Sequence, residues 1–295
     1  MIRIQLGIEL NYEVDAQGAD FVFNVEAAHT SHQIVSSEQF KLSQDIKPRF
    51  HTDPITGNRI IRLRAQPGTL CVTYGAMVSL THHHADSATL LEVPTSELPP
   101  EVMGYVYPSR YCESDRLLRL AAAQFGALPQ GYARVQAICD WVTQQVAFAS
   151  NTTDSNTSAV DTLVERVGVC RDFAHLMIAL CRAVNIPARI ATGTNYGTDA
   201  SLSPPDFHAY VEVYLSHRWY IFEPSGTGIP MGFVRFGTGR DAADVAFATI
   251  FGGVSSLAPL ITAIAIVDAM HGSVLPEICT DALSTDSAIR AAPRH

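Results

Sequence analysis

The sequence predicts an α+β protein, with an all-β N-terminal domain followed by a domain in which helices pack on an antiparallel sheet. The first part of the chain, residues 2–80, has strand-like stretches in which apolar and polar positions alternate. Between residues 114 and 185 the apolar positions recur at three and four, as in helices, and strand-like runs then return. Because 295 residues exceed what one hydrophobic core usually fills, we expect two domains.

Two stretches predict the N-terminal strands. "IRIQLGIEL" alternates apolar and polar side chains, and "RIIRLRAQPGTLCVTY" contains two β-rich runs joined by Gln-Pro-Gly-Thr at 66–69. The second stretch predicts a β-hairpin that turns at those four residues. Four prolines between residues 94 and 108 then interrupt regular structure. We therefore expect a β-rich domain at 1–95, a proline-rich linker at 96–108 and the second domain at 109–280.

The second domain is predicted to begin with four helices. Ser158 and Asp161 form a weak capping box at the start of the third helix, and Asn185 ends the fourth. The expected helices cover residues 114–125, 130–146, 158–168 and 170–185. The expected strands after them are "ARIATGT", "HAYVEVYL" and "RWYIFEP", with "APLITAIAI" as a further strand. We expect residues 281–295 to form a loose polar tail.

Composition narrows the classes of partner. A formal net charge of −9 argues against nucleic acid and against an anionic membrane surface, because both attract basic proteins. The N-terminus lacks the apolar core of a secretory signal, and "APLITAIAIVDAM" is too short to span a bilayer, so we expect a cytoplasmic protein. The six cysteines form no CxxC pair, which predicts reduced thiols without a bound metal or cofactor.

Cys170 lies in "GVCRDFAH", at the start of a predicted helix. A free cysteine is most often a small buried hydrophobe, which is the role expected of Cys139 and Cys181 on apolar helix faces. A thiol in the first turn of a helix instead faces the positive end of the helix dipole and unpaired N–H groups. These groups stabilise a thiolate and the oxyanion of a tetrahedral intermediate. Position alone leaves packing and catalysis equally open, so a nearby base is needed to decide.

His208 is the best candidate base among the eleven histidines. It follows a loop rich in Gly, Ser, Pro and Asp, residues 197–206, and it opens a strand, where a side chain is exposed yet rigidly held. His175, five residues into the helix, is expected to point away from Cys170 and to be structural.

A carboxylate partner for His208 follows from strand pairing. If the next two strands form a hairpin that turns at Ser216-His217, then Tyr210 lies opposite Glu223. Glu223 and His208 then share one face of the sheet as diagonal neighbours. A loop with an odd residue count would move Glu223 to the other face. A cysteine, a histidine and a carboxylate in this arrangement favour catalysis over packing.

Four stretches carry a resemblance to a known family: "GVCRDFAHLMIALCRAVNIPAR", "DFHAYVEVYL", "RWYIFEPSG" and "GRDAADVAF". With "YVYPSRY" and "CDWV", the similarity covers residues 105–267. The chain resembles the transglutaminase-like superfamily, specifically bacterial proteins with a β-rich region before a papain-like core. This resemblance implies that Cys170 is the nucleophile, His208 the general base and acid, and Glu223 the third catalytic residue. The family motif has aspartate where this chain has glutamate, which keeps the charge and adds one methylene.

The resemblance implies acyl transfer through a Cys170 thioester, which water or an amine then resolves. We expect a cysteine peptidase or amidase that acts on a peptide or protein substrate, because the polar loop before His208 suits an open cleft. Transamidation usually needs a closed apolar tunnel that excludes water. The Cys170 N–H is one expected oxyanion donor, while Gln144 and Gln145 fit the second role by residue type only.

Three other functions stay open. A protein-glutamine transamidase would use the same thioester, and a non-catalytic scaffold would bind peptides with the β domain. A metal enzyme could use His82 to His84, although adjacent histidines on a strand point to alternating faces and make a poor three-ligand site. If Glu223 is not the third catalytic residue, Asp206 is the next carboxylate to consider.

Overall fold

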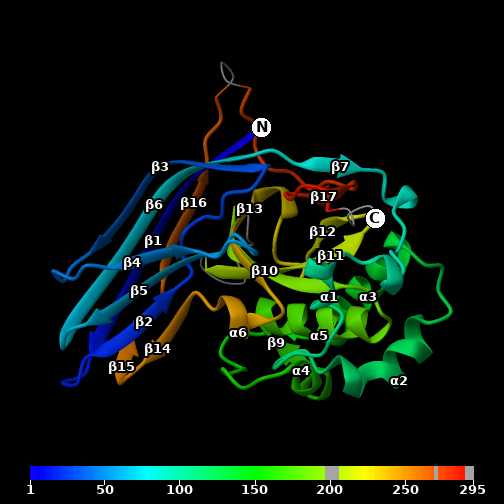
Figure 1. Cartoon of the computed structure of the whole chain (residues 1–295), viewed down its shortest axis with the longest axis horizontal. Coiled ribbons are helices and arrows are strands. Elements are labelled where there is room, and N and C mark those ends of the chain that lie inside the picture. The colour runs from blue at the N-terminus through cyan, green and yellow to red at the C-terminus, as the bar shows by residue number, and fades with distance from the viewer. Residues whose placement is uncertain (197–205, 269–271, 290–295) are drawn as a thin grey trace.

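The computed structural model describes residues 1–196, 206–268 and 272–289 and confirms the α+β class. A β-rich lobe made of the first strands lies on one side of the molecule, and the helices lie on the other (Figure 1). Between them lies a further antiparallel sheet, which belongs to the helical lobe. Within the described residues, no helix is long and apolar enough to cross a bilayer.

The β-rich lobe is a sandwich of two antiparallel sheets. One sheet has the order β15-β1-β6-β3, with β16 also paired to β1, and the other has the order β14-β2-β5-β4. Alternate side chains of both sheets fill a common core that includes stacked Phe21 and Phe23. The strands are β1 (Ile2–Val14), β2 (Ala19–Phe23), β3 (Gln33–Leu42), β4 (Arg49–Thr52), β5 (Arg59–Ala65), β6 (Gly68–Leu80), β14 (Ala248–Phe251), β15 (Val254–Ser256) and β16 (Leu260–Ala265).

The hairpin predicted over residues 59–74 is wrong. Both of its strands exist as β5 and β6, but β5 pairs with β2 and β4, whereas β6 pairs with β1 and β3. The connection at Gln66 and Pro67 therefore crosses from one sheet to the other, and Gly68, the first residue of β6, takes a positive φ of 102°. Alternation of apolar and polar residues predicts that each strand buries one face. It does not tell whether the two strands pair in one sheet, as in a hairpin, or belong to two sheets that pack face to face.

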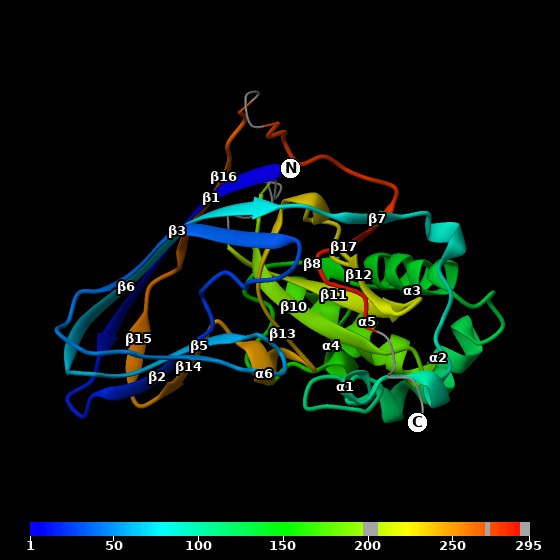
Figure 2. The same cartoon turned by 45° about the horizontal axis from the view of Figure 1, so that its top comes forward.

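The strand predicted from "APLITAIAI" exists as β16, but it joins the N-terminal lobe. β16 pairs with β1 from Ile4↔Ala265 to Glu9↔Leu260, and β14 and β15 also pair with N-terminal strands. Figures 1 and 2 show this returning segment in orange beside the blue strands. Residues 248–265 were expected in the second domain, yet they complete the two sheets of the first lobe.

The helical lobe is built around α5 (Cys170–Ala183), which packs on the sheet of order β12-β11-β10-β13. Alternate residues of β11 (Ala209, Val211, Val213 and Leu215) belong to the core that includes α5. The other strands of this sheet are β10 (Ala188–Asn195), β11 (Phe207–Leu215), β12 (Arg218–Phe222) and β13 (Phe233–Gly239). The other helices are α1 (Pro100–Met103), α2 (Ser114–Phe125), α3 (Tyr132–Gln145), α4 (Ala159–Glu165) and α6 (Ala242–Val245), with short 3-10 turns at Ser87–Thr89, Thr95–Glu97 and Pro230–Gly232.

The segment expected to be a loose tail is held in place from residue 281 to residue 289. β17 (Ala282–Ser284) pairs with β7 (His83–Ala85), and the Asp286 carboxylate contacts Arg235 and Arg189. The prediction of a loose tail rested on the polar composition of the segment. Composition does not show that its partners, β7 and the two arginines, lie elsewhere in the chain. Residues 290–295 of the expected tail lie outside the described residues.

Candidate active site

Cys170 is the first residue of α5 and follows the short strand β9 (Val167–Gly168), which pairs in parallel with β8 (Ala147–Phe148). The buried Asp172 carboxylate fixes this junction, because its Oδ2 accepts hydrogen bonds from the Val169 N–H at 2.9 Å and the Thr153 hydroxyl at 2.7 Å. A Cβ at Gly168 would lie 2.7 Å from the Asp172 Cβ, so only glycine fits there. The thiol is thus held in a helix's first turn, where backbone N–H groups are unpaired.

The predicted hairpin register is confirmed. Ser216 and His217 take positive φ angles of 44° and 67°, as the two central residues of a type I′ turn do. β11 pairs with β12 from Leu215↔Arg218 to Val211↔Phe222. Glu223 follows the last of these pairs, on the strand side where the prediction placed it.

The His208 ring lies between the other two predicted site residues. Its Nε2 is 3.2 Å from Glu223 Oε1, and a side-chain hydrogen bond links the ring to Cys170. Glu223 also accepts hydrogen bonds from the N–H and the hydroxyl of Ser225 and from the Gly228 N–H. The Cys170 Sγ is 3.9 Å from the Phe207 carbonyl oxygen. The structure therefore brings together the cysteine, histidine and glutamate that the sequence singled out.

Charge in this cluster is concentrated on the imidazole and the carboxylate. Burial by itself would lower the pKa of His208, but the neighbouring Cys170 and Glu223 outweigh burial and raise it to about 10. Burial opposes ionisation of Glu223, yet its hydrogen bonds with His208 and Ser225 hold its pKa below the usual value. Both directions describe an imidazolium paired with a carboxylate. An imidazolium beside a sulfur is the arrangement in which a cysteine reacts as a thiolate.

A small polar space lies behind the imidazole, and sequence reasoning did not predict it. The Tyr210 hydroxyl and both side-chain polar atoms of Asn195 are buried without a hydrogen-bond partner among the described residues. A Cβ at Gly228 would lie 2.5 Å from the Tyr210 hydroxyl and 3.1 Å from His208 Nε2. Gly228 therefore leaves the room in which the ring can face Glu223.

A cavity of about 600 Å³ opens in front of Cys170 and His208. One wall is aromatic, and the rings of Phe207 and Phe247 stack there with centroids 4.1 Å apart. The lining also has a polar part, which includes Ser150, Asn151, Thr153 and Arg171. This volume lies in the range of small-molecule and peptide-side-chain sites. The thiol is thus open to a ligand, although the His208–Glu223 pair is buried.

Other predicted residues lie in different surroundings. Gln144 and Gln145 do not line the cavity, so they are unsuited to be the second oxyanion donor. Asp206 does line it, and burial raises the pKa of its carboxyl group. His175 is fully buried against the Tyr111 ring, as expected of a structural histidine, and burial lowers its pKa to about 4. The polar loop cited for an open cleft falls mainly on residues 197–205, which lie outside the described residues.

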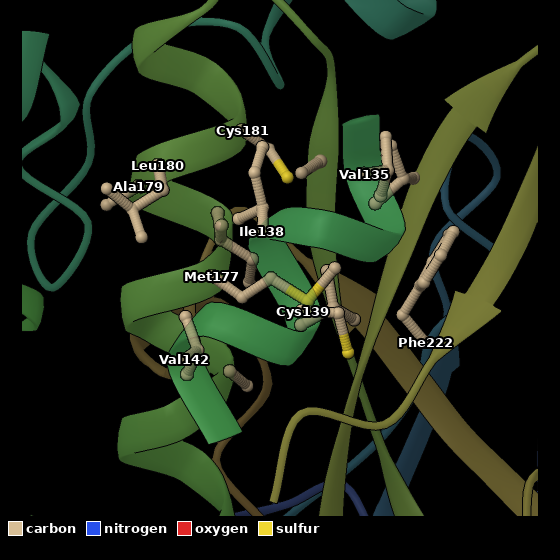
Figure 3. Close-up of a cluster of buried hydrophobic side chains, with 14 of the residues drawn as sticks. Val135, Ile138, Cys139, Val142, Met177, Ala179, Leu180, Cys181 and Phe222 are labelled. Atoms are coloured by element: carbon tan, nitrogen blue, oxygen red, sulfur yellow. The ribbon is translucent and has the colours of Figure 1, made fainter. Parts of the chain in front are cut away.

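The cysteines separate into two environments. Cys139 and Cys181 are packed in the apolar core between α3, α5 and the sheet, as predicted (Figure 3). Burial raises the pKa of both thiols and that of Cys112 well above the usual range. Of the thiols in the described part of the chain, only Cys170 lines the cavity.

Comparisons with known proteins agree with this geometry. Residues 119–224 match the family model of the transglutaminase-like superfamily, and residues 2–101 match that of the bacterial transglutaminase N-terminal domain. The fold is similar to a crystal structure from Cytophaga hutchinsonii named a "putative cysteine protease", with a TM-score of 0.89 and 36% sequence identity. That similarity covers 96% of this chain and 97% of the other.

Two curated relatives are mycobacterial. An uncharacterized protein of Mycobacterium leprae is 29% identical over 116 residues, which are 38% of this chain and 42% of that protein. An uncharacterized protein of Mycobacterium tuberculosis is 30% identical over 109 residues, which are 33% of this chain and 35% of that protein. The chain therefore matches less than half the length of these relatives.

Proposed function

The chain belongs to the transglutaminase-like superfamily, and from this premise we propose that it is a cysteine hydrolase that cleaves a peptide or isopeptide amide through a Cys170 thioester. One observation carries the proposal. The His208 ring is hydrogen-bonded to Glu223 through Nε2 and to Cys170, and the thiol faces a cavity that can hold a peptide side chain. The neighbour from Cytophaga hutchinsonii, named a "putative cysteine protease", supports the same reaction class.

In the first half-reaction, the Cys170 sulfur attacks the carbonyl carbon of the amide as a thiolate, its proton being the one held by the His208 imidazolium. A C–S bond forms, and the electron pair of the carbonyl moves to oxygen, where the Cys170 N–H can stabilise it. The intermediate then breaks its C–N bond, and the His208 imidazolium donates its proton to the leaving nitrogen. Glu223 holds the ring in place and stabilises its charged form, as the acid of a triad does.

In the second half-reaction, water resolves the thioester. Neutral His208 accepts a proton from water, whose oxygen attacks the carbonyl carbon. The C–S bond breaks, a carboxylic acid leaves, and the site returns to its starting state. No bound metal or cofactor takes part in these steps.

The polar part of the cavity lining favours hydrolysis over amine transfer. The cavity lining includes the hydrogen-bonding groups of Ser150, Asn151, Thr153 and Arg171, which bind water well. An enzyme that delivers an acyl group to an amine must exclude water from the thioester. The test is to incubate the protein with a peptide that it cleaves and a large excess of a primary amine, and then to separate the free-acid product from the amide product. We expect free acid, and predominantly amide product would make the protein a transamidase.

The substrate class is tested by incubating the protein with a proteome-derived peptide library and sequencing the new termini by mass spectrometry. We expect cleavage by the native chain and none by Cys170→Ala, with the two proteins equally folded by circular dichroism. Cleavage by both would place the nucleophile elsewhere. If the native chain yields neither cleavage nor an acyl adduct on Cys170, the protein is a non-catalytic peptide-binding scaffold.

A further inference from the structure

Three side chains of types that bind metals meet outside the cavity lining, where β7 lies beside the C-terminal segment. His84 lies on β7, while Cys279 and Asp281 lie just before β17, which pairs with β7. The ligand atoms of these three residues all lie within 4.8 Å of one another. His84 and Cys279 are 195 positions apart, so sequence spacing could not reveal the cluster.

The same ring nitrogen faces both partners. His84 Nδ1 is 3.1 Å from Asp281 Oδ2 and 3.9 Å from Cys279 Sγ. Tetrahedral zinc with ordinary bond lengths would set the nitrogen about 3.3 Å from an oxygen ligand and about 3.5 Å from a sulfur ligand. Shifts of about 0.2 Å and 0.4 Å would bring these two pairs to those separations. The third pair, Cys279 and Asp281, lies within 4.8 Å and would have to approach to about 3.5 Å. A simple hydrogen bond explains the nearness of Asp281, but it does not explain why the thiol also lies beside this nitrogen.

The donor set selects the kind of ion. A thiolate and an imidazole suit zinc and related transition metals, whereas calcium and magnesium prefer all-oxygen ligands. A cysteine thiolate and an aspartate carboxylate would also neutralise the two charges of Zn²⁺. Three protein ligands leave the fourth tetrahedral position to a water molecule, and the three side chains are exposed enough to admit one.

The position of the cluster indicates what the ion would do. β7 and β17 form only a two-stranded sheet with three paired residues, Ala282↔Ala85 to Ser284↔His83. The same C-terminal segment continues to Asp286, which is bound by Arg189 and Arg235. A metal at His84 would fasten this segment at its entry into the short strand pair, where few backbone hydrogen bonds hold it.

We propose that His84, Cys279 and Asp281 bind one zinc ion that fastens the C-terminal segment to β7. The thiol of Cys279 loses its proton to solvent as the Zn–S bond forms, and no redox step is involved. The site is separate from the proposed hydrolase site and does not depend on that function. It also departs from the expectation from sequence that the chain holds no metal.

The experiment uses the full chain without an affinity tag, in a Cys170→Ala background so that zinc cannot bind the catalytic thiol. Metal-free protein is titrated with Zn²⁺ by calorimetry, and the retained zinc is counted by mass spectrometry after gel filtration. We expect one equivalent per chain. Adding Cys279→Ser removes a direct ligand and should weaken binding by more than the roughly 10–100-fold that loss of a supporting group costs. Adding Cys71→Ser is the matched control and should change nothing, because Cys71 lies in β6 outside the cluster.

Two further measurements separate a bound metal from a loss of structure. Co²⁺ should give a thiolate charge-transfer band that Cys279→Ser abolishes while the circular dichroism stays the same. Zn²⁺ should slow proteolysis of the C-terminal segment in the parent but not in the Cys279→Ser variant. Zinc content that is equal with and without Cys279→Ser, or below about a tenth of an equivalent in the parent, would overturn the site. Unchanged proteolysis with zinc bound would overturn the fastening role.

Discussion

Strand β11 carries two buried charge clusters that differ in how fully their polar groups are paired. At its start, His208 is paired with Glu223 beside an open cavity. Four residues further on, Glu212 lies between two arginines and accepts hydrogen bonds from Arg189 Nε at 2.7 Å and Arg235 Nη1 at 2.8 Å. Asp286 of the C-terminal segment joins the second cluster through Arg235 Nη2 at 2.6 Å. The sheet is the same, but the clusters suit different roles.

The second cluster, here called the arginine cluster, consists of Arg189, Glu212, Arg235 and Asp286. Each of its charges has at least two partners of opposite sign. The charges of Arg189 and Arg235 hold the pKa of Asp286 well below its usual range, although burial opposes this shift. A network that is paired on all sides fixes one arrangement and has no free group for a ligand. We therefore assign it to structure, because it joins β10, β11 and β13 to the C-terminal segment.

The histidine cluster keeps unpaired polar groups instead. The Tyr210 hydroxyl and the Asn195 amide, both buried near His208, have no partner among the described side chains, and Cys170 faces the cavity. Unpaired buried groups cost stability and are found where function requires them. The comparison suggests that substitutions at the first cluster change turnover, while substitutions at the second change stability.

Glu223→Gln should have the largest effect. It removes the carboxylate charge that, together with Cys170, raises the pKa of His208, and it keeps nearly the same shape. We expect kcat/KM to fall by about 10²–10⁴-fold, as for a triad acid, while circular dichroism shows the same fold. Glu223→Asp should retain partial activity, because only the reach of the carboxylate changes. Full activity in Glu223→Gln would show that Glu223 is not the third catalytic residue, and Asp206 would be tested next.

Gly228→Ala should have the next largest effect. The added methyl group would lie 2.5 Å from the Tyr210 hydroxyl, 2.8 Å from the Asn195 amide nitrogen and 3.1 Å from His208 Nε2, so the ring must move. A displacement of about 1 Å costs about 100-fold in turnover. Gly104→Ala is the matched control, since no atom lies within 4 Å of its added methyl group. Equal kcat/KM in the two variants would mean that the ring position does not limit catalysis.

Asp286→Asn should change stability and leave turnover within about twofold. It leaves Arg189 and Arg235 with one carboxylate between them, and a fifth of the Asp286 side chain is exposed, so we expect a loss of about 2 kcal/mol in urea unfolding. Asp20→Asn breaks the exposed pair with Arg64 and should cost less than about 1 kcal/mol. If both variants lose the same stability, the arginine cluster has no special structural role.

The stability lost in Asp286→Asn should depend on pH in a defined direction. Because the pKa of Asp286 is lower in the folded chain than in the unfolded chain, its contribution is complete above the unfolded value of about 4 and is lost as pH falls through the folded value. The stability difference between the native chain and Asp286→Asn should therefore be constant near neutral pH and shrink in acid. A difference that grows in acid would contradict the assigned pKa direction.

The sequence predicted local features and lacked information on distant pairing. Helix starts, the two-residue turn at Ser216-His217 and the strand parity that aligns His208 with Glu223 depend on neighbours within a few residues. The structure agrees with the turn and the parity, and with the helix starts to within two residues. The assigned catalytic roles remain predictions. Alternation also identified β5 and β6 but could not tell which sheet each would join.

The features that the sequence could not predict depend on segments far apart in the chain. The pairing of β16 with β1, the contact of Asp286 with Arg235 and the meeting of His84 with Cys279 each join residues separated by tens to hundreds of positions. A polar composition at 281–289 is compatible with a loose tail until the partners of its charges are known. The unpaired Tyr210 hydroxyl likewise has no signature in a strand pattern.

The most direct test of the account is the rate at which each thiol reacts with iodoacetamide as pH is varied, measured by peptide mass spectrometry. The account predicts that at mildly acidic pH Cys170 reacts many times faster than Cys71 or Cys279, because it lies beside the His208 imidazolium and lines the open cavity. Glu223→Gln should remove most of this advantage, whereas Glu212→Gln should not. Labelling of Cys170 no faster than that of Cys71 at that pH, or labelling unaffected by Glu223→Gln, would contradict it.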